Sequence, residues 1–397
     1  MSKLKNNRKS IADLIIRENF IFDNIIEEFK DISDLKVVPQ NPEYHKEGNV
    51  YIHTRNVCNE VIRLNEWKEL SEEEKVTLYL SCFFHDIGKG ICTKIENGEL
   101  VSPKHAIKGS KLIRKLFFSD SNIDYFMDFT LREKVCALIK YHGLPLFFMD
   151  KPFMERELIR VSECINMRLL YLLGKSDILG RECSDKNKLL NEVEYFKEYC
   201  LELGCFDKTK VFANEYTKFK FLNGESILYH EDEIYDITKF DVFVMCGLPL
   251  SGKDAYISRN LNNIPMISLD DIRDEFKIHP SHNSGKVASI AKERAKALLR
   301  EKKSFVWNGT NIISDTRKKL IRQFSDYGAR VHFIYIEAPY KQLIHRNDKR
   351  KRTVSKKVID NMIERFDMIE PWEGFSQTIV ILSLIHISEP TRHAQIS

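Results

Sequence analysis

The sequence lacks the features that mark several classes of protein. None of its nine cysteines forms a C-x-x-C pair, which argues against a zinc ribbon or a disulfide framework and favours reduced thiols. No apolar run approaches the length that spans a membrane, and the charged N-terminus has no apolar core of a secretory signal. We therefore expect a cytoplasmic protein without a membrane partner.

Excess charge, internal repeats and low-complexity linkers are also scarce. The formal net charge of +4 over 397 residues is nearly balanced, so any affinity for nucleic acid has to come from local basic patches. Hydrophobic residues make up 43% of the chain, which is enough for more than one core. The length predicts two domains, or three.

The first half of the chain carries the apolar spacing of helices. Apolar residues recur at helical spacing over 158–180, which predicts one long helix there. Ser71 precedes Glu74 by three positions, the signature of a capping box that opens a helix. These patterns predict an all-α domain over residues 1–203.

The chain changes character after this helical part. Residues 204–240 are expected to form a connector with short strands, including one over 217–222. Residues 383–397 fit no domain and look like translated adapter sequence, so they are excluded from the fold prediction.

Strand and helix patterns alternate over residues 241–382. Such alternation predicts an α/β domain, with a parallel sheet flanked by helices. The expected strands lie at 242–246, 264–269, 305–307 and 331–336.

A glycine-rich loop follows the first of these strands. Gly247 to Lys253 reads G-x-x-x-x-G-K, with Ser251 and Gly252 before the lysine. Such loops close their backbone N–H groups around phosphate oxygens, and the lysine adds a positive charge. Asp254 stands where Ser or Thr is usual, and a carboxylate beside phosphates needs a cation between them. We expect ATP or another NTP to bind there with Mg²⁺.

Two acids follow the second predicted strand. Residues at the carboxyl ends of parallel strands face the ligand crevice, so Asp270 could accept a proton there, and Arg273 could hold a phosphate. Alternation along the strand points Asp270 to the crevice and leaves Asp271 to cap the next helix. The alternative is an ordinary helix start with two acids near its dipole.

A basic segment follows the fourth predicted strand. Arg346 and Arg350 are four positions apart, so on a helix they share one face. Two such guanidinium groups could clamp a phosphoryl group in transfer, as in a lid. A solvated charged face is the alternative.

Histidines and aspartates in the helical half form a candidate metal site. Neutral imidazoles and carboxylates suit a divalent transition metal that supports hydrolysis. The candidate ligands are His53, His85, Asp86 and Asp177, with His105 and His142 as further candidates. His142 could instead be a satisfied core histidine, and His45 and Glu47 either line the pocket or are solvated loop residues.

The helical half resembles the HD phosphohydrolase superfamily. The resemblance rests on His85-Asp86-Ile-Gly-Lys89 and on the family pattern H…HD…D, matched by His53, the His85-Asp86 pair and Asp177. It implies that these four residues hold the metal and that Lys89 pairs with a phosphate. Members of this family often carry accessory ligands near the positions of His105 and His142.

The second half resembles the P-loop polynucleotide 5′-kinases of RNA repair. That resemblance implies that Asp270 is the general base and that Arg273 contacts the acceptor phosphate. It also implies that Arg346 and Arg350 stabilise the transition state. Asp254 departs from the Ser or Thr of many members, and the third predicted strand ends without an acid.

Both modules in this order resemble the bifunctional RNA end-healing enzymes. The resemblance implies removal of a 2′,3′-cyclic phosphate or 3′-phosphate and phosphorylation of a 5′-OH. The partners would be RNA or DNA ends, with a separate ligase left open. Two alternatives remain: an HD nucleotidase or phosphodiesterase fused to a small-molecule kinase of the nucleoside type, and a non-catalytic nucleotide sensor.

Overall fold

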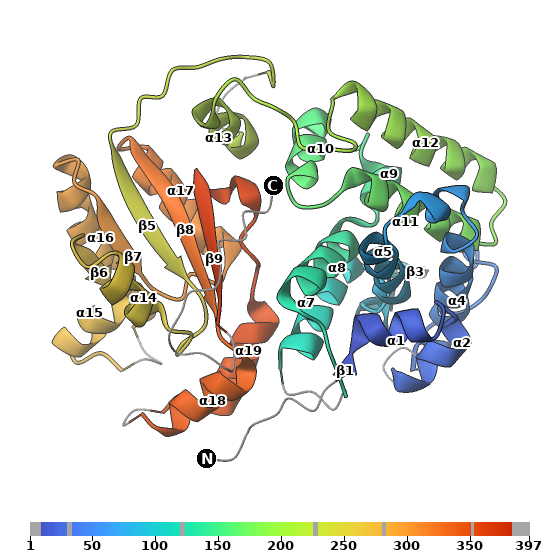
Figure 1. Cartoon of the computed structure of the whole chain (residues 1–397), viewed down its shortest axis with the longest axis horizontal. Helices are drawn as coiled ribbons and strands as arrows, with labels where there is room; N and C mark the ends of the chain where they lie inside the picture. Colours follow the sequence, from blue (N-terminus) through green and yellow to red (C-terminus); the bar gives the residue numbers. More distant parts are fainter. Residues whose placement is uncertain are drawn as a thin grey trace. The chain divides into compact units, whose positions relative to one another are not determined.

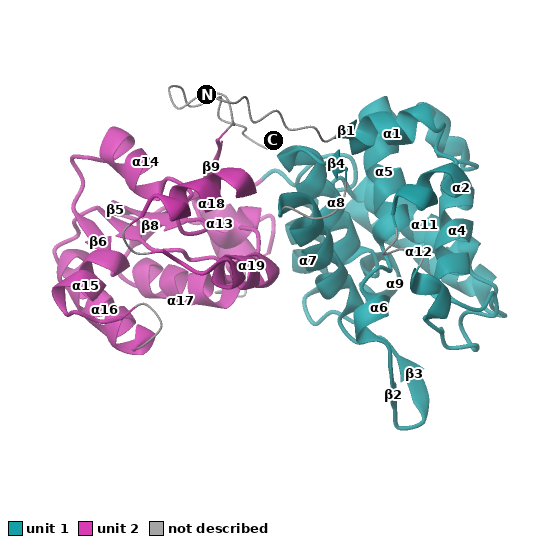
Figure 2. Ribbon diagram, turned by 90° about the horizontal axis from the view of Figure 1, so that it is seen from below, with its two compact units in different colours: residues 1–211 teal, residues 212–397 magenta. Residues whose placement is uncertain are grey.

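The chain divides into two compact units, residues 1–211 and 212–397 (Figure 2). The structure is a computed structural model, and it describes residues 9–29, 34–119, 124–224, 229–279, 283–350 and 353–382. The division lies within the connector expected at 204–240. The suspected adapter sequence at 383–397 lies outside the described residues.

Unit 1 consists mainly of helices (Figure 1). The α-helices are α1 (Ile11–Arg17), α2 (Phe22–Ile25), α4 (Val50–Val61), α5 (Glu72–Phe84), α6 (Lys89–Cys92), α7 (His105–Phe118), α8 (Phe129–Tyr141), α9 (Leu144–Phe147), α10 (Met154–Ser162), α11 (Met167–Gly180) and α12 (Lys186–Glu202). Short 3-10 turns are η1 (Ile26–Glu28), η2 (Asp34–Val37) and η3 (Asn65–Glu69). Two strand pairs complete the unit, β1 (Lys9–Ser10) with β4 (Tyr125–Phe126) and β2 (Lys94–Glu96) with β3 (Glu99–Val101).

Helix α5 lies in the core of unit 1. Its capping box is confirmed, because Ser71 Oγ accepts from Glu74 N and the Glu74 carboxylate accepts from Ser71 N. Every residue from Val76 to Phe84 is buried, as expected of a helix packed on all sides. Helices α4, α8 and α11 pack against it, which brings the ends of these helices together.

The single helix predicted over 158–180 is wrong. Two helices occupy this stretch, α10 and α11, with a break between Ser162 and Met167. Asn166 restarts the helix as an N-cap, because its side chain accepts from Arg168 N. Buried apolar residues lie on both sides of the break, so apolar spacing alone does not reveal the cap.

The strand predicted over 217–222 is also wrong. Residues Glu215–Asn223 form helix α13, which belongs to unit 2. The side chain of Asn214 accepts from Thr217 N and so caps the start of the helix. Alternating lysine and phenylalanine suggested a strand, but the cap and the packing of Phe219 against Phe375 favour the helix.

Unit 2 contains a five-stranded parallel sheet with the order β6-β7-β5-β8-β9 (Figure 1). The strands are β5 (Phe240–Cys246), β6 (Met266–Ser268), β7 (Phe305–Asn308), β8 (Ala329–Glu337) and β9 (Ser376–Ile381). The remaining elements are α14 (Lys253–Asn260), α15 (Leu269–Glu275), α16 (Ser284–Arg300), α17 (Ser314–Ser325), α18 (Tyr340–Asp348), α19 (Lys356–Arg365) and η4 (Pro371–Glu373). The parallel sheet flanked by helices is as predicted, except that β9 was missed.

The sheet buries both faces, and the side-chain alternation of the strands sorts residues between them. On one face Met245, Val306 and Ile334 pack with Ile257 of α14. On the other face Phe305 and Trp307 contact Phe324 of α17 edge to face. Helices therefore cover both faces of the sheet, and the carboxyl ends of the strands are the side left uncovered.

A buried ion pair connects the loops near the carboxyl ends of the strands. The Arg317 side chain is 0% exposed, and its Nε and Nη2 each lie 2.6 Å from an oxygen of Glu373. The remaining N–H groups donate to the backbone carbonyls of Asn311, Asp367 and Met368. All five guanidinium donors therefore have acceptors, as a buried charge requires.

Replacing Arg317 with methionine is expected to destabilise unit 2 by about 3–5 kcal/mol, because it leaves the Glu373 carboxylate buried without its partner. Chemical denaturation of the full chain measures this loss. The double variant Arg317→Met/Glu373→Leu is the control and should recover part of the loss. A single variant within 1 kcal/mol of wild type, by the range typical of surface sites, would contradict the assignment.

Candidate active sites

The six candidate metal ligands converge in unit 1. His53 lies in α4, the His85-Asp86 pair directly follows α5, and His105 is the first residue of α7. His142 directly follows α8, and Asp177 lies near the end of α11. Gly88 allows this convergence, because a Cβ there would lie 2.1 Å from the backbone oxygen of His105. The described residues contain three groups of possible metal ligands; two lie wholly within this cluster, and the third joins His53 to His45 and Glu47.

Each histidine of the cluster is oriented through its Nδ1 atom. His85, His105 and His142 place Nδ1 at 2.8 Å from the backbone oxygens of Cys82, Ser102 and Ile139, respectively. A carbonyl only accepts, so Nδ1 carries the proton and Nε2 of the neutral ring is bare. This arrangement fixes the tautomer that binds a metal through Nε2.

The bare nitrogens face one another in two pairs. His53 Nε2 lies 3.3 Å from His85 Nε2, and His105 Nε2 lies 3.3 Å from His142 Nε2. Two lone pairs at this distance repel unless a cation lies near both. The donor chemistry therefore fits divalent metal ions, with nitrogen ligands typical of zinc, iron or nickel.

Asp86 lies between the two histidine pairs. Its Oδ2 is 3.2 Å from His85 Nε2, and its Oδ1 is 3.3 Å from His105 Nε2. Oδ1 is buried and has no hydrogen-bond partner, as expected of an atom that serves as a metal ligand. Asp177 Oδ1 lies 3.0 Å from His53 Nε2. The cluster can thus hold two metal ions that share Asp86, with Asp177 on the side of His53.

The charge states of these groups suit metal binding. Burial and the neighbouring His105 and His85 lower the pKa of His142 to about 3, so its ring is neutral at pH 7. Burial would raise the pKa of Asp86, but Lys89 and His85 hold it well below its ordinary value. Lys89 Nζ lies 2.7 Å from Asp86 Oδ2, so the predicted phosphate contact sits beside the metal ligands.

The structure adds two residues that the sequence did not assign, Arg181 and Gln40, and decides between the two alternatives left open for Glu47. Arg181 forms an ion pair with Asp177 at 2.6 Å, and Gln40 accepts from Lys89 Nζ at 2.7 Å. Glu47 places Oε1 at 2.9 Å from His53 Nδ1 and at 2.8 Å from His45 Nδ1. The Glu47 side chain is 1% exposed, so it is not a solvated loop residue. It contacts His53 at Nδ1, the ring nitrogen that does not face the other ligands.

Replacing Glu47 with glutamine is expected to lower the metal affinity of unit 1 by about 10–100-fold, the usual cost of losing an outer carboxylate behind a histidine ligand. Competition with a chromophoric chelator measures this affinity. Glu43→Gln, an exposed change in the same loop, is the matched control. Equal affinities for both folded variants would show that Glu47 does not tune His53.

The predicted phosphate loop lies between β5 and α14 in unit 2. Gly247 and Gly252 have φ of 140° and 108°, values that only glycine adopts readily. A Cβ on Gly247 would also lie 2.5 Å from the backbone oxygen of Ile336. Ser251 Oγ is buried without a hydrogen-bond partner. The loop therefore has the backbone form that cradles phosphates.

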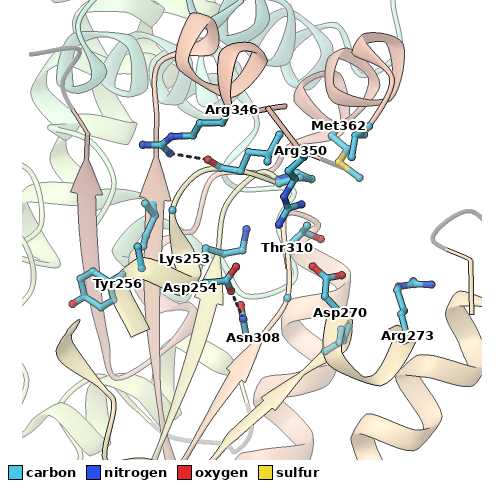
Figure 3. Close-up of a pocket in the computed structure, with 18 of the residues that line it drawn as sticks. Lys253, Asp254, Tyr256, Asp270, Arg273, Asn308, Thr310, Arg346, Arg350 and Met362 are labelled. Carbon is cyan, nitrogen blue, oxygen red and sulfur yellow. Dashed lines mark hydrogen bonds between the residues drawn. The ribbon is translucent and has the colours of Figure 1, made fainter. Parts of the chain in front are cut away.

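Lys253 lies at the first position of α14. Its Nζ donates to the backbone oxygens of Gly247 and Leu248 at 3.0 and 2.8 Å, so it spans the loop. Desolvation lowers the pKa of Lys253 to about 8, while the carboxylates of Asp254 and Asp270 act in the opposite direction. Both carboxylates line the same pocket as this ammonium group (Figure 3).

The two acids after β6 lie differently from the prediction. Helix α15 begins at Leu269, and Ser268 is its N-cap, because Ser268 Oγ accepts from Asp271 N at 3.1 Å. The expected cap at Asp271 is therefore wrong, and strand alternation does not apply to either acid. Asp270 nevertheless lines the pocket, which Asp271 does not, and Figure 3 shows its carboxylate inside the same pocket as Lys253 and Asp254.

Three arginines line the pocket around these groups. Arg273 donates to Ser284 Oγ at 3.1 Å, and Arg346 donates to the backbone oxygen of Leu250 at 2.8 Å. Arg350 also lines the pocket, but α18 ends at Asp348, so the shared helix face predicted for Arg346 and Arg350 is wrong. Arg346 and Arg350 nevertheless line the same pocket, because the chain turns after the end of α18.

Asn308 was not assigned from the sequence. It ends β7, it is buried, and its Nδ2 donates to Asp254 Oδ1 at 2.8 Å (Figure 3). The only sequence signal was the polar end of this strand, which carries an amide where many P-loop proteins carry an acid.

Two family models match the chain. The HD domain model covers residues 50–161, which include every candidate metal ligand except Asp177, and the AAA domain model covers residues 242–369. The chain thus contains a helical HD domain followed by a P-loop kinase domain with a parallel sheet flanked by helices. The predicted fold class is confirmed.

A curated relative and a solved structure are each similar to part of the chain. The chain is 26% identical over 134 residues to the L-seryl-tRNA(Sec) kinase of Methanococcus maripaludis, which covers 32% of this chain and 52% of that protein. The chain thus spans about half the length of this relative. A solved structure from Chloroflexus aurantiacus matches 36% of this chain and 86% of its own, with 14% identity and a TM-score of 0.30. A likeness this low carries no argument.

No helix in the described parts of the chain is both long and apolar enough to cross a membrane.

Proposed function

We propose that the chain is a bifunctional enzyme that modifies the ends of nucleic acids. The HD domain would hydrolyse a 2′,3′-cyclic phosphate or 3′-phosphate, and the kinase domain would transfer the γ-phosphoryl group of ATP to a 5′-OH. The observation that supports this most is the acceptor side of the P-loop pocket. There Asp270 lies in the same pocket as Arg273 and Lys277, so the position for the hydroxyl adjoins cationic groups that suit a phosphodiester chain.

In the HD domain, the residues hold and orient the reacting groups. Asp86, Asp177 and the four histidines would hold divalent metal ions, which supply an activated water and polarise a phosphoryl oxygen. Lys89 lies beside Asp86 and offers an ammonium group to a phosphate oxygen. Arg181 keeps Asp177 ionised, because it holds the pKa of that carboxylate well below its ordinary value against the effect of burial.

In the kinase domain, the residues divide the work of phosphoryl transfer. The loop and Lys253 bind the nucleotide phosphates, and Asp270 accepts the proton of the attacking hydroxyl. Arg273 binds the phosphate next to that hydroxyl. Arg346 and Arg350 balance the charge that develops on the transferred group. Most of the acceleration comes from position and charge, since this transfer needs little covalent help from the protein.

The relative supports a kinase and leaves its acceptor open. The name of this relative describes a kinase that acts on a seryl group attached to tRNA. An RNA-linked hydroxyl is therefore one candidate acceptor for this chain. A small nucleoside-type acceptor is the second candidate, because the similarity covers only 52% of the relative and so does not carry its acceptor over to this chain. The size of the acceptor therefore decides between the two.

An RNA oligonucleotide with a 5′-OH and a 2′,3′-cyclic phosphate tests the proposal. The protein is incubated with ATP and Mg²⁺, with Mn²⁺, Ni²⁺ or Zn²⁺ added in turn, and both ends are analysed. The proposal expects a 5′-phosphate only with ATP and loss of the cyclic phosphate without it. A DNA oligonucleotide of the same sequence and a free nucleoside are the matched acceptors. Phosphorylation of the nucleoside alone would contradict a polynucleotide kinase and favour a small-molecule kinase of the nucleoside type.

Replacing Asp270 with asparagine is expected to lower the 5′-kinase rate by about 10²–10⁴-fold, the range typical of a lost general base. The neighbouring Asp271→Asn is the matched control, because Asp271 lies outside the pocket and Ser268 caps the helix. That control should keep its rate and melt within a few degrees of wild type. Transfer of ³²P and thermal melting measure both. A near-normal Asp270→Asn beside an inactive Asp271→Asn would reverse the assignment.

A further inference from the structure

The metal side of the P-loop pocket has an unusual pair of residues. P-loop enzymes commonly hold Mg²⁺ with the hydroxyl that follows the lysine and with an acid at the end of a neighbouring strand. This chain has the acid after the lysine, at Asp254, and an amide at the strand end, at Asn308. A hydrogen bond of 2.8 Å from Asn308 Nδ2 to Asp254 Oδ1 joins them (Figure 3). The acid therefore stands at the other of the two positions, and an amide takes the place at the strand end.

From this pair we infer that Asp254, positioned by Asn308, makes nucleotide binding depend on a divalent cation, so that the pocket accepts Mg–ATP and rejects metal-free ATP. The inference rests on the proposed function, because it takes ATP as the ligand of the P-loop.

The charge at Asp254 carries the first step. A hydroxyl at this position is neutral, so it tolerates a bare triphosphate. A carboxylate adds a full negative charge at the second residue of α14, next to the lysine that binds phosphates. Repulsion between this carboxylate and a bare triphosphate weakens binding by about 10²-fold. A divalent cation between them turns the repulsion into two attractions.

The position of Asn308 carries the second step. Asn308 is 7% exposed and lies in the sheet, where Ser268 of β6 is its neighbour in register. Its amide therefore has a fixed place, and its bond to Oδ1 restricts the rotation of the exposed Asp254 side chain. The bond leaves the second oxygen of the carboxylate for the cation. Loss of such an outer partner typically costs about 10–100-fold in metal affinity.

Calorimetric titration of the full chain with ATP tests the inference, once with excess Mg²⁺ and once with EDTA. The wild type is expected to bind ATP at least about 10²-fold more weakly in EDTA. Asp254→Asn should bind metal-free ATP more tightly than wild type. It should therefore lose most of the difference in ATP affinity between Mg²⁺ and EDTA. Asn308→Ala should reduce the difference by about tenfold through weaker metal binding. Electron paramagnetic resonance of Mn²⁺ added with ATP reports the metal without any turnover.

Two further variants make the test specific. Asp274→Asn removes another carboxylate that lines the same pocket and should leave the difference unchanged. Asp254→Thr/Asn308→Asp restores the common arrangement and should bind metal-free ATP more tightly than wild type while retaining Mg–ATP. Melting curves confirm that each variant is folded.

The outcomes separate this inference from the proposed function. Tight wild-type binding of ATP both with Mg²⁺ and in EDTA would overturn the inference and leave the nucleotide site standing. An equal effect of Asp274→Asn and Asp254→Asn would also overturn it, because general pocket charge would then explain the difference. No binding of ATP under either condition would overturn both the inference and the proposed kinase.

Discussion

Replacing Asp86 with asparagine is expected to reduce the proposed phosphoester hydrolysis to background and to remove the bound metal. Both oxygens of Asp86 face histidine Nε2 atoms, at 3.2 Å for His85 and 3.3 Å for His105. An asparagine keeps one oxygen, turns an amide toward the other histidine pair and removes the charge that balances the cations. One substitution therefore disturbs the ligands of both cation positions. Elemental analysis of the purified variant and hydrolysis of the 2′,3′-cyclic phosphate measure the two losses.

The control for this variant lies in the same molecule. The 5′-kinase rate of Asp86→Asn should stay near that of wild type, because unit 2 contains all of its own phosphate-loop residues. Asp150→Asn, an exposed change in the same unit, should alter neither activity. A variant with normal metal content and normal hydrolysis would show that the cluster around Asp86 is structural.

Replacing Lys253 with alanine is expected to have the opposite result, with the 5′-kinase at background and the hydrolysis unchanged. Lys253 Nζ reaches the backbone oxygens of both Gly247 and Leu248, so the ammonium group sits where the loop closes around phosphates. Alanine removes the charge that binds the transferring end of the nucleotide. The loop also loses two hydrogen bonds, but its glycine conformations remain. Transfer of ³²P and titration with Mg–ATP measure the effect.

Lys286→Ala is the matched control for this second variant, because Lys286 is an exposed lysine of α16 outside the pocket. It should retain both activities. Equal loss of hydrolysis and phosphorylation in Lys253→Ala would contradict two independent sites. A folded Lys253→Ala with a normal kinase rate would remove the loop from the proposed mechanism.

The sequence predicts which residues lie together where the pattern is local in the chain. The phosphate loop lies within seven consecutive positions after an apolar strand, so its strand, turn and helix follow from one short pattern. His85, His105 and His142 lie at helix ends, where a side chain comes close to the next element, and His53 lies in the first turns of α4. The fold class and the gathering of the candidate ligands could therefore be anticipated.

Pairs that meet only through the tertiary fold could not be anticipated. Asn308 and Asp254 are 54 positions apart, and nothing in either segment announces the other. Arg317 looked like one basic residue among several in a helix, yet it is fully buried against Glu373. The cap of α15 was also predicted wrongly, since its N-cap is Ser268 and not Asp271. Each of these depends on which backbone groups a neighbouring element leaves without partners.

The position of β5 in the middle of the sheet has a consequence for how the protein is made on the ribosome. This strand is translated before both of its neighbours, and Val242 pairs with Phe305 of β7 and with Val331 of β8. At a synthesis rate of about 5–20 residues per second, the nascent strand waits roughly 3–13 seconds for its first partner. Unit 1 has its helices complete by then, but of the kinase sheet only β5 and β6 exist, and these two strands do not pair with each other, so the apolar β5 keeps both edges open. Chaperone dependence during translation should therefore concentrate in the second unit.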